Sequence, residues 1–359
     1  MKAVQYLAPL VFLPLTASAV FFGGWWSFNV PLVAFVMVPL VELISKGTGE
    51  NFTAEEEEKA LNNPLYDIVV YSVVPLQLAV LTYYLWTVSS GTMDTLSFVG
   101  ATLSMGISCG TFGINVGHEL GHRKTWYEQW MAKTLLFTSM YMHFFIEHNR
   151  GHHKRVATEE DPATARYGET VFAFWLRSMT MGYISAWKIE NLRLSKKNKN
   201  WFSLGNEMLQ LQLIQIVGWV TVFFVLSPLA LVAWFVVSLM GILLLETVNY
   251  LEHYGLTRKQ KDNGRYERVL PIHSWNSNHS LGRLLLFEVT RHSDHHAHSN
   301  RRYQILRHFE ESPQLPTGYP GMILLALCPP LWFSVMHPHI EQYNKRYQQI
   351  SQTPQPASA

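Results

Sequence analysis

The sequence predicts an all-α fold, in which a polytopic membrane protein of about six transmembrane helices carries a cytoplasmic histidine-rich di-metal module. Three observations support this fold class. Only 15% of the 359 residues are charged, against about 25% in a typical soluble domain. Six apolar runs have about the length that crosses a bilayer. Histidines gather, at the spacing of helix turns, in the connections between these runs.

The six apolar runs place spans near residues 8–26, 30–45, 67–88, 95–116, 208–226 and 229–249. The first run has an alternative, because Lys2 precedes it and residues 17–19 (Ala-Ser-Ala) resemble a signal-peptide cleavage site. Apolar sequence continues through Trp25 and Trp26, which favours an uncleaved helix. The last apolar run is broken at residues 328–330 (Cys-Pro-Pro), so we expect a re-entrant or surface-lying helix there and not a seventh span.

The connections between the spans sort by charge. Those at 27–29, 89–94 and 227–228 are short and contain no Lys or Arg, whereas the longer connections carry the positive charge. The positive-inside tendency therefore places segments 117–206 and 250–332, and both termini, in the cytoplasm. We treat 1–332 as a single membrane-embedded domain and 333–359 as a C-terminal tail, in which residues 352–359 have the composition of a linker.

The polar connection at 45–64 also lies on the cytoplasmic side. There Thr53 and Glu56 form a capping box that begins a short acidic helix.

The composition excludes several functions. A net charge of +2 gives no reason to expect a nucleic-acid partner. With only Cys109 and Cys328, the chain cannot build a disulfide framework, a Cys-ligated zinc module or an iron–sulfur centre of its own. Any metal must therefore be held by histidine, carboxylate or both.

The candidate metal ligands are nine histidines spaced by one helix turn or placed at the end of a span. Such spacing puts imidazoles on one helix face, as a shared ion requires. A structural zinc site takes four ligands, so nine imidazoles imply two ions. The candidate ligands are His118, His122, His148, His152, His153, His253, His292, His295 and His296.

Polar residues beside these histidines are candidates to support the rings. Glu246 and Asn249 precede His253 by seven and four residues on an otherwise apolar span, where polar groups must pair. Asn115 stands in a similar relation to the first histidines. The supporting set is Asn115, Glu119, Glu246, Asn249 and Asp294.

The residues alone leave the metal open among zinc, copper, iron and nickel. Residues 118–122 read His-Glu-Leu-Gly-His, a complete H-E-x-x-H, so an intramembrane zinc metalloprotease with Glu119 as general base is the main alternative. That alternative leaves the other histidine clusters unexplained. The Glu-x-x-His pairs of soluble di-iron bundles do not fit, because only Glu119 and His122 form one.

The histidine motifs resemble those of the integral-membrane alkane 1-monooxygenases, within the membrane hydroxylases and desaturases that carry histidine boxes. The first two boxes, at 118–123 and 147–153, are shared in outline with fatty-acid desaturases. The segments at 249–256 (Asn-Tyr-Leu-Glu-His-Tyr-Gly-Leu) and 291–297 (Arg-His-Ser-Asp-His-His-Ala) resemble alkane hydroxylase signatures. The resemblance extends to Trp332. This chain departs from the usual pattern at Val289, Thr290 and His279, and none of these departures removes a ligand.

The resemblance implies terminal hydroxylation of medium to long n-alkanes with O2 at two non-haem irons. It also implies electrons from rubredoxin, reduced in turn by an NADH-dependent reductase, and a place in the inner (cytoplasmic) membrane, where the alkane arrives from the bilayer. A desaturase remains the second alternative by resemblance. Several basic residues flank the boxes and could meet an acidic donor, although positive-inside bias alone also explains them: Arg123, Lys124, Arg150, Lys154, Arg155, Arg301 and Arg302.

The remaining histidines lack the cluster context, and we expect them mostly at the surface. They are His143, His273, His279, His298, His308, His337 and His339.

Overall fold

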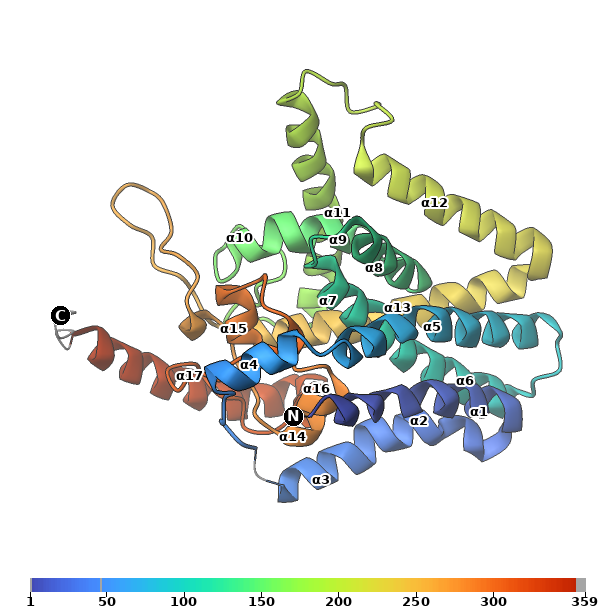
Figure 1. Ribbon diagram of the computed structural model, residues 1–359, viewed down its shortest axis with the longest axis horizontal. Helices are drawn as coiled ribbons and strands as arrows, with labels where there is room; N and C mark the ends of the chain where they lie inside the picture. The colour runs from blue at the N-terminus through green and yellow to red at the C-terminus, as the bar shows by residue number, and fades with distance from the viewer. Residues whose placement is uncertain (1, 46, 353–359) are drawn as a thin grey trace.

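The computed structural model describes residues 2–45 and 47–352. These residues form helices, with two isolated β-bridges and no longer strand, which confirms the predicted all-α class. Figure 1 labels the α-helices. They are α1 (Phe12–Phe22), α2 (Asn29–Leu32), α3 (Val38–Ile44), α4 (Ala54–Leu61), α5 (Leu65–Ser89), α6 (Thr95–Ser108), α7 (Gly117–Gly121), α8 (Trp126–Thr138), α9 (Phe144–Glu147), α10 (His153–Arg155), α11 (Val171–Ser195), α12 (Glu207–Thr221), α13 (Pro228–His253), α14 (Ser280–Leu285), α15 (His292–Ala297), α16 (Tyr319–Ala326) and α17 (Pro329–Gln352).

Six helical segments of the described residues are long and apolar enough to cross a membrane, as predicted. They are Ala3–Phe22, Gly24–Ile44, Leu65–Ser89, Thr95–Gly121, Glu207–Leu226 and Pro228–His253. The fourth and sixth spans continue past the predicted ends at 116 and 249, to Gly121 and His253. Sequence hydropathy ends these spans too early, because their last turns carry polar residues that other parts of the protein cover. The first histidine motif and His253 therefore lie at the ends of spans and not in loops.

The spans form three hairpins whose short turns lie together at one end of the molecule, while α7, α10 and α15 lie toward the other (Figure 1). Gly23, with a φ of +61°, makes the first turn, and a Cβ there would lie 2.6 Å from Ser97 Oγ. Asp94 and Ser227 begin the fourth and sixth spans as N-caps, each accepting a backbone N–H from three residues ahead.

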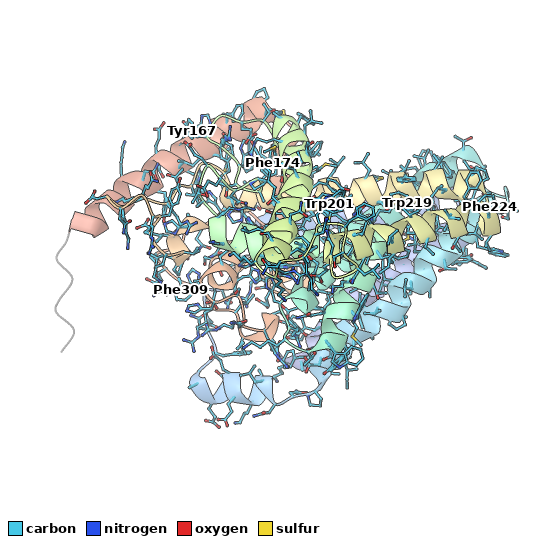
Figure 2. The ribbon with its side chains drawn as sticks, turned by 90° about the horizontal axis from the view of Figure 1, so that it is seen from above. Tyr167, Phe174, Trp201, Trp219, Phe224 and Phe309 are labelled. Atoms are coloured by element: carbon cyan, nitrogen blue, oxygen red, sulfur yellow. The ribbon has the colours of Figure 1, made fainter. Side chains whose placement is uncertain are left out.

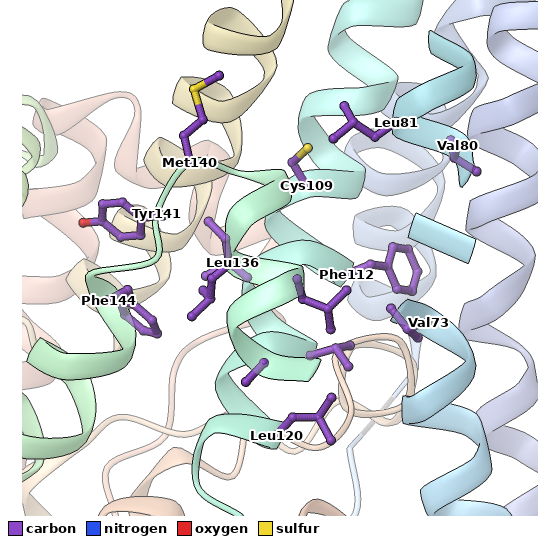
Figure 3. Close-up of a cluster of buried hydrophobic side chains, with 14 of the residues drawn as sticks. Val73, Val80, Leu81, Cys109, Phe112, Leu120, Leu136, Met140, Tyr141 and Phe144 are labelled. Carbon is purple, nitrogen blue, oxygen red and sulfur yellow. The ribbon is translucent and has the colours of Figure 1, made fainter. Parts of the chain in front are cut away.

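The fourth span lies at the centre of the bundle between α5, α8 and α13. Figure 3 shows apolar side chains from α5, this span and α8 gathered in the core, among them Val73, Phe112 and Leu136. At the crossing with α13 the backbones come close, since a Cβ on Gly241 would lie 2.9 Å from the backbone nitrogen of Gly110. Small residues at such a crossing let two membrane helices pack closely without side-chain interference.

The segments outside the spans confirm one prediction and correct another. Thr53 and Glu56 form the predicted capping box at the start of α4. The chain breaks after α16 as predicted, but residues 333–352, which we assigned to a tail, continue α17 and bury Met336 and Ile340. Proline fits the first turn of a helix, so residues 329–330 begin a helix and do not end one. The predicted linker at 352–359 lies, beyond Gln352, outside the described residues.

Candidate metal centre

The nine candidate ligands lie on segments that the fold brings to one place. His118 lies on α7, the last turns of the fourth span, and His122 caps it. His253 is the last residue of α13. The second histidine motif lies on the π-helical turn His148–His152 and the start of α10, and the third lies on α15.

Within the described residues these histidines form two groups, in each of which the candidate ligand atoms lie within 4.8 Å of one another. The five-histidine group consists of His118, His122, His148, His153 and His295. The four-histidine group consists of His152, His253, His292 and His296. All nine predicted histidines are therefore brought together, and two groups match the expected number of ions. Their binding of metal remains a prediction.

The spacing of the ring nitrogens fits metal binding. Neighbouring Nε2 atoms lie 2.8 to 3.2 Å apart in both groups. Two nitrogens bound cis to one ion at about 2.1 Å would lie about 3.0 Å apart. Facing lone pairs of buried imidazoles repel each other, whereas a divalent cation between them attracts both. The donor set therefore fits an all-nitrogen or nitrogen-rich site for a first-row transition metal.

Burial also keeps these rings in the form that binds metal. It lowers the pKa of His122, His148, His153, His292, His295 and His296 well below the ordinary value for histidine, and neighbouring imidazoles lower it further. These six rings are therefore neutral at pH 7, with lone pairs free for an ion.

The π-helical turn decides which of the two groups each histidine of the second motif joins. The sequence spacing suggested that His148 and His152, four residues apart, would face one ion. A π-helix bonds residue i to i+5 and not i+4. His148 accordingly pairs with His153, at 3.0 Å between Nε2 atoms, whereas His152 belongs to the other group. This one motif thus contributes to both groups.

Sequence reasoning missed Asp161, which holds one ring in place. Its Oδ2 lies 2.8 Å from Nδ1 of His152 and also accepts the hydroxyl of Thr164. Burial lowers the pKa of His152, but Asp161 together with Glu147 and Glu246 outweighs burial, and the net shift of the pKa is upward. A carboxylate on the far nitrogen fixes the tautomer and orientation of a ligand ring. The separation of nine positions along the chain gives no periodic signal that could have predicted this pair.

Sequence reasoning also missed Glu252, the neighbour of His253. Its Oε2 lies 3.1 Å from Nε2 of His292, the nitrogen that faces the four-histidine group, and its Oε1 accepts a hydrogen bond from Tyr319. The side chain is 1% exposed. Glu252 is therefore placed to add an oxygen donor to the four-histidine group, and its position beside a span-end histidine was the available signal.

The five predicted supporting residues lie near the centre, but their hydrogen bonds go elsewhere. Glu246 accepts from Tyr141 and Ser178, and Asn249 donates to Glu246. These contacts show why spacing along one helix misled the prediction: the carboxylate is satisfied by α11 and by the segment before α9, not by a ligand ring.

The other three supporting residues behave in the same way. Asn115 donates to the carbonyl of Leu286. Glu119 accepts from Arg123, and Asp294 accepts from Arg301 and from the backbone of Arg307 and contacts His298. Each of these three side chains bonds to residues other than the nine candidate ligands and orders the backbone around the centre.

The seven histidines expected at the surface differ in burial, and His279, His308 and His337 are partly buried. His298 and His339 are exposed, as predicted. His143 and His273 are buried instead, which corrects the prediction for both. His273 pairs with Glu267, whereas Nε2 of His143 has no hydrogen-bond partner among the described residues. Tertiary packing covers these rings, and no local pattern predicted it.

An apolar cavity reaches both groups. Its lining includes His118 and His148 of the five-histidine group, His292 of the four-histidine group, and Glu252. Most of the wall is apolar and comes from the first, second, fourth and sixth spans, with Phe12, Val30, Phe35, Ile107, Leu244 and Val248. Its apolar wall suits a hydrocarbon chain with one end at the histidine groups.

Most of the basic residues that flank the motifs are neutralised within the chain. Arg123 pairs with Asp67, Glu119 and Glu128, and Arg302 also pairs with Asp67. The others form similar ion pairs, Arg150 with Glu190 and Glu207, Arg155 with Glu147, and Arg301 with Asp294. Of the seven candidates, Lys124 and Lys154 are exposed and have no ion pair within the described residues.

The six spans and the two histidine groups define a membrane protein with a histidine-rich site suited to two metal ions. Comparison with known proteins agrees with this class. Residues 94–326 match the family model "Fatty acid desaturase". The chain is 42% identical over 321 residues to alkane 1-monooxygenase 1 of Alcanivorax borkumensis, covering 89% of this chain and 79% of that protein. It is 42% identical over 320 residues to the alkane 1-monooxygenase of Ectopseudomonas oleovorans, covering 88% and 79%. It is also 27% identical over 351 residues to the hydroxylase component of a xylene/toluene monooxygenase of Pseudomonas putida, covering 95% and 90%.

These similarities extend over nearly the whole chain and include both histidine groups. The protein belongs to the alkane 1-monooxygenase family.

Proposed function

We propose that this enzyme hydroxylates the terminal methyl group of medium to long n-alkanes to 1-alkanols with O2 at a di-iron centre formed by the two histidine groups. The observation that carries the proposal is the contact between the apolar cavity and both groups. The alkane 1-monooxygenases at 42% identity support the same reaction.

The residues of this chain would bind, orient and shield the substrate. An alkane offers no polar group, so only shape and burial can hold it, and the apolar wall of the cavity supplies both. His118, His148 and His292 line the same cavity, so a terminal methyl group can approach both groups. Exclusion of water by the apolar wall protects reactive species from side reactions. The bound irons would supply the redox chemistry with O2 that an unactivated C–H bond demands.

The donor set favours iron. The five-histidine group would hold one ion, and the four-histidine group with Glu252 would hold the other. Mixed imidazole and carboxylate ligands are typical of non-haem iron sites. Elemental analysis of protein purified without chelators is expected to give about two irons per chain, and one zinc without iron would contradict the proposal.

We further propose that the two reducing electrons come from rubredoxin, which an NADH-dependent reductase reduces, at the face that carries the histidine groups. The chain has only Cys109 and Cys328, too few for a rubredoxin-type iron site, so the donor must be a separate domain or protein. The positive-inside pattern of the connections supports our proposal that this face lies in the cytoplasm and that the enzyme lies in the inner membrane.

The geometry argues against the zinc-protease alternative. In such an enzyme the glutamate of H-E-x-x-H must face the metal-bound water. Here Oε1 of Glu119 accepts hydrogen bonds from Nε and Nη2 of Arg123, at 3.1 and 3.0 Å. This carboxylate is engaged in an ion pair and does not act as a base toward the histidines.

The reaction is tested with purified enzyme, iron, O2, rubredoxin, reductase and NADH, with products analysed by gas chromatography. A liquid n-alkane is expected to give the primary alcohol, and His292→Ala or His253→Ala is expected to abolish the product. His339→Ala is the matched control, because that side chain is exposed and distant in sequence from the groups. Alkene formed from an acyl-carrier substrate, without alcohol from any alkane, would instead identify a desaturase.

A further inference from the structure

The helix α11 exposes an apolar face although it is not one of the six spans. Between residues 171 and 184 it carries one charged side chain, Arg177, which pairs with Glu169. A helix whose outer face meets water carries polar residues there, so an exposed apolar face marks a contact surface. The large apolar side chains exposed on α11 and on the loop that follows it are Phe172, Leu176, Met181, Tyr183, Ile184, Leu192, Trp201, Phe202 and Leu204.

This helix packs against the sixth span close to the end of that span. Nε1 of Trp175 donates to Oγ1 of Thr247 at 3.1 Å, and Oγ of Ser178 donates to Oε2 of Glu246 at 2.6 Å. Thr247 lies six residues before the span ends at His253, which is about 9 Å along the helix. Figures 1 and 2 both show α11 running across the direction of the spans. The helix therefore lies at the level where the headgroups of a bilayer meet the acyl chains.

The exposed face of α11 borders the surface that the fifth and sixth spans present to lipid. Tyr183 lines a groove together with Trp219 of the fifth span and Leu239 of the sixth. Tyr183 and Leu239 are both exposed. Only 11% of the most apolar window of the fifth span is buried, so lipid covers most of that span. Acyl chains that cover these two spans therefore also reach the apolar face of α11.

The far end of α11 and the loop after it are basic. The acidic residues on either side along the chain are already paired, Glu190 with Arg193 and Glu207 with Lys133. Four lysines in this region are exposed and form no ion pair within the described residues. They are Lys188, Lys196, Lys197 and Lys199. Unpaired lysines beside exposed aromatic side chains, at the level of the headgroups, match a bilayer surface that carries negative charge.

We propose that α11 and the loop at 196–204, together the lateral arm, lie in the membrane leaflet on the side of the histidine groups and bind anionic phospholipids there. The apolar side chains of the lateral arm insert among the acyl chains, and the four lysines contact the phosphate headgroups. Negative headgroups neutralise lysines that no described residue neutralises. Binding of lipid at the lateral arm does not depend on the proposed reaction.

Insertion is tested with iron-loaded enzyme in nanodiscs of phosphatidylcholine and phosphatidylglycerol. A fluorophore is attached to Leu176→Cys or Phe202→Cys in a Cys328→Ser background, because Cys328 is exposed and Cys109 is buried. Both positions are expected to be quenched by a phospholipid with a doxyl group near its headgroup and not by acrylamide in the water.

Two labelled controls bracket this result. Val217→Cys lies on the lipid-facing fifth span and is expected to be quenched by the doxyl lipid, and Glu58→Cys on the polar helix α4 by acrylamide alone. Quenching of the lateral arm by acrylamide alone would place it in water. Protection from both quenchers would show that protein, such as a second copy of the chain, covers it, and either result would overturn the inference.

Headgroup preference is tested by titrating the fluorophore at position 202, in detergent, with doxyl-labelled phosphatidylglycerol or phosphatidylcholine. Phosphatidylglycerol is expected to reach half-quenching at the lower concentration. Lys196→Gln combined with Lys197→Gln is expected to raise that concentration about 25-fold, or about fivefold for each lysine. Lys59→Gln combined with Lys261→Gln is the matched control, because both lysines are exposed on other segments, and iron content is expected to be unchanged in both variants. Equal quenching by the two lipids, or an unchanged half-quenching concentration without Lys196 and Lys197, would refute binding of anionic lipid.

Discussion

Replacing Asp161 by asparagine is expected to weaken metal binding at one of the two groups and not at the other. Asp161 is buried, and its Oδ2 lies 2.8 Å from Nδ1 of His152, a member of the four-histidine group. Asparagine keeps the size and one acceptor oxygen, and its amide can still meet the hydroxyl of Thr164. The change therefore removes the charge with little loss of packing.

The size of the effect follows from the role of such a carboxylate. A partner on the far nitrogen of a ligand histidine contributes about 10- to 100-fold to metal affinity. This corresponds to about 1.4–2.8 kcal/mol. None of the hydrogen bonds of Asp161 reaches the five-histidine group, so affinity there is expected to be unchanged.

Metal-free protein is titrated with Fe(II) under anaerobic conditions, and calorimetry of this titration resolves the two binding steps. The Asp161→Asn variant is expected to keep one step at wild-type affinity and to show the other weakened by the factor above. Asp94→Asn is the matched control, because Asp94 caps α6 at the other end of the fourth span and asparagine caps equally well. Equal weakening of both steps, or of neither, would refute the assignment of Asp161 to the His152 ring.

Three further predictions test the packing, the donor surface and the first motif. Gly241→Val places a side chain about 2.9 Å from the backbone of Gly110, so thermal unfolding in detergent should show a loss of about 1–3 kcal/mol. Lys124→Glu combined with Lys154→Glu should raise the KM for rubredoxin at low salt without changing iron content, because these two exposed charges are unpaired within the described residues. An unchanged KM would place the donor elsewhere. Glu119→Gln should keep alcohol formation within about tenfold of wild type, because Glu119 is paired with Arg123; a loss of about 10² or more with intact metal would indicate a general base.

Much of the fold could be predicted from the sequence because its signals are local. A span is recognised from the length and apolar character of one continuous segment, and the six predicted spans are present. The capping box of Thr53 and Glu56 depends on residues three apart and was predicted correctly. The nine histidines were found in the same way, because helix-turn spacing is visible without tertiary information.

Only the tertiary structure decided which histidines share a group and what surrounds them. A π-helical turn moves His148 next to His153 and sends His152 to the other group, and a prediction based on the regular α-helical period cannot detect that turn. Asp161 meets His152 through a loop, and Arg123 meets Asp67 across 56 residues, so both pairs depend on how distant segments pack. Spans and motifs follow from interactions along one segment, whereas ring partners and neutralised charges follow from contacts between segments.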